Sequence, residues 1–282
     1  MTSFSGIKAK GRHKEAAGLS DEEEENQDQD ETRSVKVEER TGERVPMADF
    51  PRGTEVGNVL HLILEKADFA STDNKEMISA ILKKKMNFSN EELASNAENV
   101  NKCLNNVLSA PIFEMGKTLR DVSEEERTAE MKFFISIGND IARGMISKIM
   151  EEDYGTPKLE DDSVRKGLLN GSIDLVAHID GKYYIIDWKS NDLGETFSDY
   201  DSTNITEEMK KHNYHLQYML YLAAFDRYMK KVVSGYSYDD FGGVRYVFLR
   251  GVKAGSTDTG VFYDRPEESE LRKIQELFKG EK

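Results

Sequence analysis

GSIDLVAHIDGKYYIIDWKSN, residues 171–191, is the stretch that decides the fold, because it predicts a β-hairpin inside a sheet. Two runs rich in Ile, Val and Tyr flank Asp180-Gly181. An Asp-Gly pair between such runs is a strong signal for a two-residue turn. With those two residues as the loop, Ile179 pairs with Lys182, and this register fixes every other cross-strand pair.

The register brings charged side chains together at one end of the hairpin. Asp174 stands opposite Asp187, and Lys189 projects from the same face as Asp187 because side chains alternate along a strand. Opposed Cβ atoms lie roughly 4.5–5.5 Å apart, and like charges this close are destabilising unless a proton or a cation lies between them. The hairpin therefore predicts a divalent-metal site with an ammonium beside it.

The simpler alternative is a solvated acidic pair on a surface hairpin, which is the commonest setting for such residues. The flanking residues favour a buried hairpin instead, because both of its faces are apolar and such hairpins lie inside covered sheets. Buried carboxylates are costly unless they are compensated. One face carries Val176 opposite Ile185, and the other is expected to carry Ile173, Leu175, Ile186 and Trp188.

The composition limits the setting of the protein. The 282 residues have a net charge of −14, and residues 20–33 are almost wholly polar and acidic, so residues 1–45 are expected to form a disordered tail or linker. Cys103 is the single cysteine, which fits a reducing cytoplasm. Neither a signal peptide nor a membrane span is predicted. An acidic chain binds nucleic acid through local basic strips and metal ions rather than through its overall field.

Residues 46–282 are expected to form one α/β domain with a mixed sheet and a helical N-terminal section. The first helix has Thr54 as its N-cap, and a later one starts near Ser89 with Glu92 in the capping-box position. The pattern then predicts a strand at 130–137, a helix at 139–151, the hairpin, one long helix at 207–232, strands at 243–250 and 261–263, and a terminal helix with Pro266 as its first residue.

Four further residues are ambiguous from spacing alone. His61 lies among apolar residues of the first helix, where a histidine is usually a hydrogen-bonded core residue, although imidazole can also join carboxylates around a divalent ion. Gln217 and Tyr221 share a helix face and could contact phosphate or bases, or simply bridge helix and sheet. Glu130 begins its strand either as a surface carboxylate or as a further ligand or water-binding group.

Several segments in order carry a family resemblance. They are GNVLHLILE at 57–65, AEMKFF at 129–134, GSIDL at 171–175, DWKSN at 187–191, LQYMLY at 216–221 and GYSYDDFGGVRYVFLRG at 235–251. Together they resemble the C-terminal nuclease domain of RecB proteins, which belongs to the PD-(D/E)XK nuclease superfamily, from about residue 46 to the end. The resemblance implies a restriction-endonuclease-like fold, with a mixed central sheet flanked by helices.

The resemblance also implies roles for the candidate residues. Metal binding falls to His61, Asp174, Asp187 and the main-chain carbonyl of Trp188, where the family often has tyrosine. Lys189 is implied as the catalytic lysine beside the two aspartates. Gln217 and Tyr221 correspond to the helix motif of RecB-like nucleases, and Glu130 to an acidic position near the site.

The expected activity is hydrolysis of DNA phosphodiester bonds in repair, recombination or degradation, with Mg²⁺ or Mn²⁺ as cofactor and Ca²⁺ as an inhibitor. The expected substrate is DNA that is single-stranded or has free ends, and a helicase subunit of a RecBCD-like complex is a candidate partner. Two alternatives stay open at this point. The fold could bind DNA without cutting it, or the chain could be a nuclease subunit that is active only within a helicase–nuclease complex.

Overall fold

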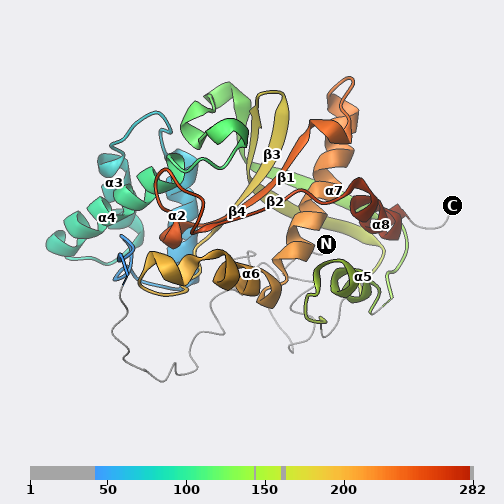
Figure 1. Ribbon diagram of the computed structural model, residues 1–282, viewed down its shortest axis with the longest axis horizontal. Coiled ribbons are helices and arrows are strands. Elements are labelled where there is room, and N and C mark those ends of the chain that lie inside the picture. Colours follow the sequence, from blue (N-terminus) through green and yellow to red (C-terminus); the bar gives the residue numbers. More distant parts are fainter. Residues whose placement is uncertain (1–41, 143, 160–162, 280–282) are drawn as a thin grey trace.

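A five-stranded mixed sheet forms the centre of the protein in the computed structural model, which describes residues 42–142, 144–159 and 163–279 (Figure 1). Its strands lie side by side in chain order: β1 (Arg127–Ile137), β2 (Gly167–Ile179), β3 (Lys182–Lys189), β4 (Phe241–Phe248) and β5 (Val261–Asp264). Only β3 and β4 run parallel, and the other neighbours are antiparallel. The mixed α/β sheet predicted from the sequence is confirmed.

Helices cover both faces of the sheet and bury two apolar clusters. One cluster holds residues of α2 (Thr54–Lys66), α3 (Lys75–Lys85) and α4 (Asn90–Leu108). The other holds residues of α5 (Met145–Tyr154), α6 (Ser202–Lys211), α7 (Tyr214–Val232) and α8 (Glu268–Lys279). None of the helices within the described ranges is long and apolar enough to cross a membrane.

The hairpin has the predicted turn and register. Asp180 and Gly181 both have positive φ, 51° and 77°, as a type I′ turn requires. The β2–β3 ladder runs from Ile179–Lys182 to Leu175–Ile186 and ends one pair before Asp174 and Asp187. Because the ladder stops there, the two aspartates lie at an open end of the hairpin.

One expected facing of the hairpin is wrong. Leu175 lies in the cluster under α2–α4 as predicted, but Ile173 lies in the opposite cluster, with Val176 and Ile185. The facing of β2 therefore changes at Asp174. At the same level of β1, Glu130 has a left-handed backbone (φ 51°), and the β1–β2 pairing skips this one position between Ala129–Leu175 and Met131–Ile173.

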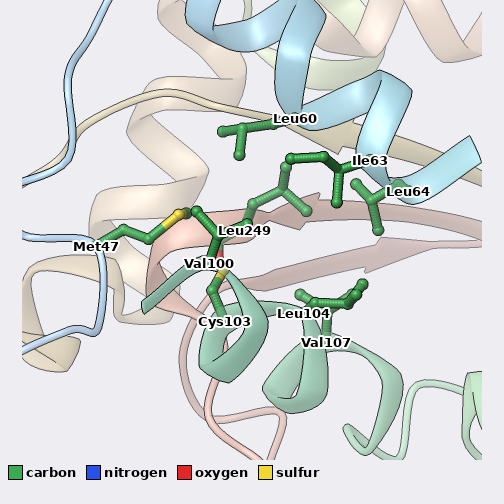
Figure 2. A pocket seen from close by; sticks show the side chains of 9 residues that line it. All are labelled: Met47, Leu60, Ile63, Leu64, Val100, Cys103, Leu104, Val107 and Leu249. Atoms are coloured by element: carbon green, nitrogen blue, oxygen red, sulfur yellow. The ribbon is translucent and has the colours of Figure 1, made fainter. Parts of the chain in front are cut away.

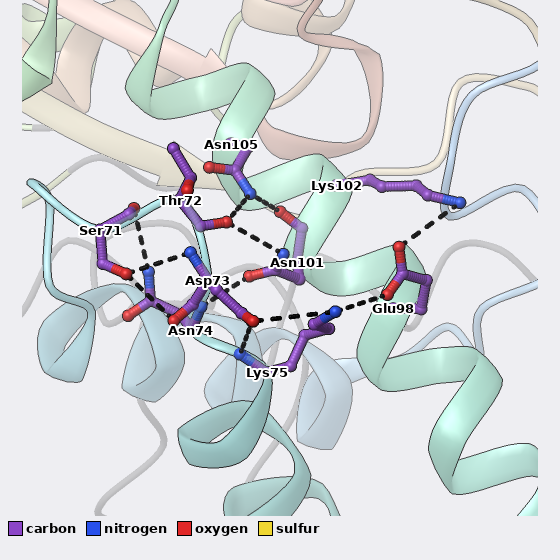
Figure 3. Close-up of polar contacts among 9 residues, drawn as sticks. All are labelled: Ser71, Thr72, Asp73, Asn74, Lys75, Glu98, Asn101, Lys102 and Asn105. Atoms are coloured by element: carbon purple, nitrogen blue, oxygen red, sulfur yellow. Dashed lines mark hydrogen bonds and ion pairs between the residues drawn. The ribbon is translucent and has the colours of Figure 1, made fainter.

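Helix α2, which carries His61, packs with α3 and α4 into a helical section stabilised by a helix cap and by side-chain amide hydrogen bonds. Helix α2 begins at Thr54 itself, with Gly53 as its N-cap, so the predicted cap is one residue off. Helix α4 has the predicted capping box between Ser89 and Glu92. Figure 3 shows a polar network in which the Asn101 side chain accepts a hydrogen bond from the Asn74 N–H at 2.9 Å and further amides hold the α2–α3 loop against α4.

The predicted long helix is two helices. Helix α6 ends at Lys211, and Asn213, with φ 54°, starts α7 in a new direction. Asparagine tolerates this left-handed conformation better than most residues. Helix α8 begins at Glu268, two residues after the predicted Pro266.

Residues 1–41 of the expected tail lie outside the described residues. The last residue of that expected tail, Val45, is buried and its N–H donates to the Glu195 carbonyl at 2.9 Å.

A small apolar cavity of about 20 Å³ lies between α2 and α4 (Figure 2). Its wall includes Cys103, whose thiol donates to the Leu249 carbonyl and whose pKa is raised by burial to about 12. A water molecule needs two or more polar partners, which this apolar wall does not offer. The cavity is therefore a packing feature of the helical section rather than a ligand site.

Candidate active site

Helix α2 and the end of β3 bring an imidazole, a carboxylate and a main-chain carbonyl together. His61 Nε2 lies 3.1 Å from the Trp188 carbonyl oxygen, and His61 Nδ1 lies 3.7 Å from Asp174 Oδ1. The other oxygen of Asp174 accepts a hydrogen bond from the Trp188 N–H at 2.8 Å. The carboxylate thus replaces the main-chain partner that β3 loses where the ladder ends, and this fixes its position.

Glu130 joins this group from β1. Its Oε2 accepts a hydrogen bond from the Ser172 hydroxyl at 2.9 Å. Ligand atoms of His61, Glu130 and Asp174 all lie within 4.8 Å of one another. The sequence left Glu130 open between a surface carboxylate and a further ligand or water-binding group, and the structure shows it exposed and within reach of His61 and Asp174.

Asp187 and Lys189 form a buried ion pair beside the group. Their side chains are only 3% and 4% exposed, and Lys189 Nζ lies 3.0 Å from Asp187 Oδ2. The pKa of Asp174 is raised well above its usual range, first by burial and then by the charge of Asp187, against the opposing effects of His61, the Trp188 N–H and Lys189. The two aspartates therefore interact as the hairpin register predicted. The carboxylate of Asp187 is nevertheless not one of the two that cluster with His61, those of Glu130 and Asp174.

Lys189 is held by an amide and an aromatic ring of α7. Gln217 Oε1 accepts from Lys189 Nζ at 3.0 Å and from the Tyr246 hydroxyl at 2.9 Å. The ammonium lies 3.9 Å from the centre of the Tyr214 ring. These contacts orient the ammonium group of the lysine.

Tyr214 and Tyr246 are the site residues that sequence reasoning missed. Tyr214 lies one turn before Gln217 and so shares its face, which was a usable signal. Tyr246 stands beside Asp187 in the parallel β3–β4 pairing, and that neighbour becomes known only once the strand order is known. The predicted Tyr221 is buried in the core, where its ring meets Phe133 edge-on at 5.6 Å.

A second chain of hydrogen bonds supports Tyr214. The Asn191 amide donates to the Tyr214 hydroxyl at 3.2 Å and to Glu208 Oε1 at 2.9 Å, and His212 Nε2 lies 3.0 Å from the same Glu208 oxygen. Burial alone would raise the pKa of Glu208, but the hydrogen bond and charge of His212 and the hydrogen bond from Asn191 together lower it. These hydrogen bonds therefore fix the Tyr214 ring that contacts the Lys189 ammonium.

Arg250 ties the two sides of the site together. Its buried guanidinium donates to the Ser190 carbonyl at 3.2 Å, one residue after Lys189, and to the Met47 carbonyl at 2.9 Å, in the segment that leads into α2. This contact holds the helix that carries His61 against the end of β3.

The donor set fits a divalent cation. A recess is lined by His61, Glu130, Asp174 and Trp188, together with Arg127 from the start of β1. Carboxylate, carbonyl and imidazole donors suit small divalent ions.

Comparisons with known proteins identify the family. The sequence matches the family model of the PD-(D/E)XK nuclease superfamily over residues 32–281. It is 34% identical over 234 residues to RecBCD enzyme subunit RecB of Haemophilus influenzae, and 34% identical over 237 residues to the protein of that name from Escherichia coli. The Borreliella burgdorferi protein of that name is 27% identical over 282 residues.

These matches cover most of this chain and a small part of each relative. They span 82%, 82% and 94% of the chain, but only 19%, 20% and 22% of the respective relatives, so the chain spans about a fifth of their length. The family model covers well over half of the chain, and the mixed sheet flanked by helices is the restriction-endonuclease-like fold that the resemblance implied. The chain belongs to the PD-(D/E)XK nuclease superfamily and resembles the nuclease domain of RecB proteins.

Proposed function

We propose that this chain is a Mg²⁺-dependent deoxyribonuclease that hydrolyses phosphodiester bonds. The observation that carries the proposal is the cluster of His61, Glu130 and Asp174 beside the buried Lys189–Asp187 pair. Degenerate folds that bind DNA without cutting it would be expected to lack a carboxylate or the lysine. Both kinds of group are present at this site.

His61, Asp174, Asp187 and the Trp188 carbonyl are the residues that would hold the cation, with Glu130 close to His61 and Asp174. When bound, a divalent ion supplies a Lewis acid for the phosphate and lowers the pKa of a bound water. We take the ion to be Mg²⁺, with Mn²⁺ as a substitute and Ca²⁺ as an inhibitor.

Lys189 supplies the positive charge at the other side of the reaction. Its Nζ, held by Gln217 and the Tyr214 ring, can donate to a non-bridging oxygen of the scissile phosphate or orient the attacking water. A fixed ammonium in a buried site stabilises the charge that develops on the phosphorane-like transition state. Attack in line with the 3′ oxygen leaves a 5′-phosphate.

The setting of the activity is also a proposal. The relatives are named as subunits of a RecBCD enzyme, and this chain corresponds to about a fifth of each. We propose that residues 46–282 form the nuclease domain and that it acts in the cytoplasm on DNA that is single-stranded or has free ends. We propose a helicase subunit as its partner.

The test compares the purified chain with two variants on linear and circular single-stranded DNA, with and without Mg²⁺. Lys189→Met should abolish cleavage and retain the Mg²⁺-induced rise in melting temperature, whereas Asp174→Asn should abolish both. The asparagine can still accept from the Trp188 N–H, so the fold should survive. Wild-type cleavage by both variants would contradict the assignment. Tight DNA binding without any metal-dependent cleavage, even with an added helicase subunit, would support the non-cleaving alternative.

A further inference from the structure

Outside the site, β1 and β2 carry one open face. Cross-strand pairing sets Lys132 beside Ser172, Phe134 beside Asn170 and Ser136 beside Leu168, and we call these six residues the open strip. Phe134 is 64% exposed and Leu168 48% exposed. The opposite face of the same strands is covered by α7 and α8, and Figure 1 shows α2–α4 gathered over the other end of the sheet.

The open strip begins at the proposed catalytic centre. Ser172 donates its hydroxyl hydrogen bond to Glu130, which clusters with His61 and Asp174. Phe134 follows Glu130 by four residues on the same strand, a separation of about 14 Å at the usual rise of an antiparallel strand. At the rise of a stacked strand of DNA, this separation corresponds to about four nucleotides.

The chemistry of the strip suits single-stranded nucleic acid. Proteins that bind such strands combine cations that follow the backbone with aromatic rings on which bases stack. Lys132 lies between the site and Phe134, and the exposed Arg165 and Lys166 directly precede the strand at the far end, beyond Leu168. In a chain with net charge −14, a local group of cations is what a polyanion requires.

Exposure of the Phe134 ring to water is unfavourable, and a nucleobase stacked on the ring would remove part of this unfavourable free energy. Large apolar side chains at 64% exposure leave surface in water that a base would cover. A base must be unpaired and splayed from its neighbours to lie on a side chain in this way. The strip therefore selects a single strand over a duplex.

We propose that the open strip is a platform for the single strand next to the scissile phosphate, with one base stacked on Phe134 and Lys132 beside the backbone. This inference rests on the proposed nuclease function and adds to it the surface that guides the substrate.

The test measures binding of labelled dT20 and of a 20-base-pair duplex to the full chain in EDTA. Phe134→Ala should weaken dT20 binding about 5- to 150-fold, the range for loss of one base–aromatic stack, and change duplex binding little. Phe134→Trp should bind dT20 about as tightly as the wild type, and dT20 should quench the fluorescence of the new tryptophan. The single native tryptophan, Trp188, is buried, so the quenching can be assigned to position 134. Tyr228→Ala and Tyr228→Trp are matched controls, since Tyr228 is 49% exposed on α7 outside the strip.

The outcomes distinguish a platform for single-stranded DNA from a protein interface. Unchanged dT20 affinity in Phe134→Ala, no dT20 binding by the wild type, or equal quenching in Phe134→Trp and Tyr228→Trp would overturn the proposal. Unchanged DNA affinity together with loss of self-association or of helicase binding would instead mark the strip as a protein interface. Binding of dT20 with the expected losses, but no Mg²⁺-dependent cleavage even with an added helicase subunit, would keep the strip and remove the nuclease function.

Discussion

Gly171→Ala is the substitution whose effect the structure specifies most closely. Gly171 stands opposite Phe133 in the β1–β2 ladder, and a Cβ at this glycine would lie 2.5 and 2.8 Å from two atoms of the Phe133 ring. The ring is only 8% exposed and meets Tyr221 edge-on at 5.6 Å. It has little room to move away, so the new methyl group must displace packed side chains.

The expected cost follows from overpacking. Inserting a methyl group into a well-packed core usually destabilises by about 1–3 kcal/mol. For a chain of this size each kcal/mol lowers the melting temperature by about 2–4 °C, so the expected fall is about 2–12 °C. The backbone itself is not strained by alanine, because Gly171 is not among the positive-φ glycines.

A double-mutant cycle separates the clash from other effects. The free energy of unfolding is measured in denaturant for Gly171→Ala, Phe133→Leu and the pair. Leucine lacks the ring atoms that the new Cβ meets, so Gly171→Ala should cost less than about 1 kcal/mol in that background. Ser136→Ala, on the exposed face of β1, is the control and should change stability by no more than about 0.5 kcal/mol. An equal cost of Gly171→Ala in both backgrounds would refute the ring clash.

Three further outcomes are expected. Burial lowers the pKa of His215 to about 4, so its neutral form stabilises the fold fully above about pH 6.5. The free energy of unfolding therefore falls by about 1.4 kcal/mol per pH unit as the pH drops from about 6.5 towards 4. In His215→Phe, the free energy of unfolding measured in denaturant should depend less on pH in this window. Gln217→Leu removes an acceptor from Lys189 and should lower kcat about 10- to 150-fold with dT20 affinity unchanged, whereas unchanged kcat would contradict the positioning role. Cys103, buried with a pKa of about 12, should react with thiol reagents only upon unfolding, and rapid reaction of native protein would contradict its burial.

Local chemistry was enough to predict the hairpin. The Asp-Gly turn and the apolar alternation fix the register from neighbouring residues alone, and the structure has that register from Ile179–Lys182 onward. The facing of Ile173 could not be predicted in the same way. It depends on the interruption at Asp174, which involves the left-handed Glu130 on a strand more than 40 residues away in the sequence.

The same distinction applies to the site. Asp174, Asp187 and Lys189 belong to one hairpin, and their proximity follows from strand geometry. The positions of His61 and Glu130 came only through the family resemblance, because helix and strand packing brings them in from elsewhere. The break between α6 and α7 was not predicted, because it depends on the left-handed backbone of Asn213, which the spacing of apolar residues does not reveal.

Charge balance explains why these groups are arranged around a cation. Glu130, Asp174 and Asp187 contribute three negative charges when ionised and Lys189 one positive charge, which leaves a net charge of −2 with His61 neutral. Burial raises the pKa of Asp174 most, and the charge of Asp187 raises it further despite the opposing effect of Lys189, so the lysine does not offset both aspartates. A divalent cation would balance these four side chains, and Arg127 and Glu65, which also line the recess, carry opposite charges. For this reason Lys189→Met, which makes the site more negative, should keep its affinity for the cation while losing the ammonium that the reaction needs.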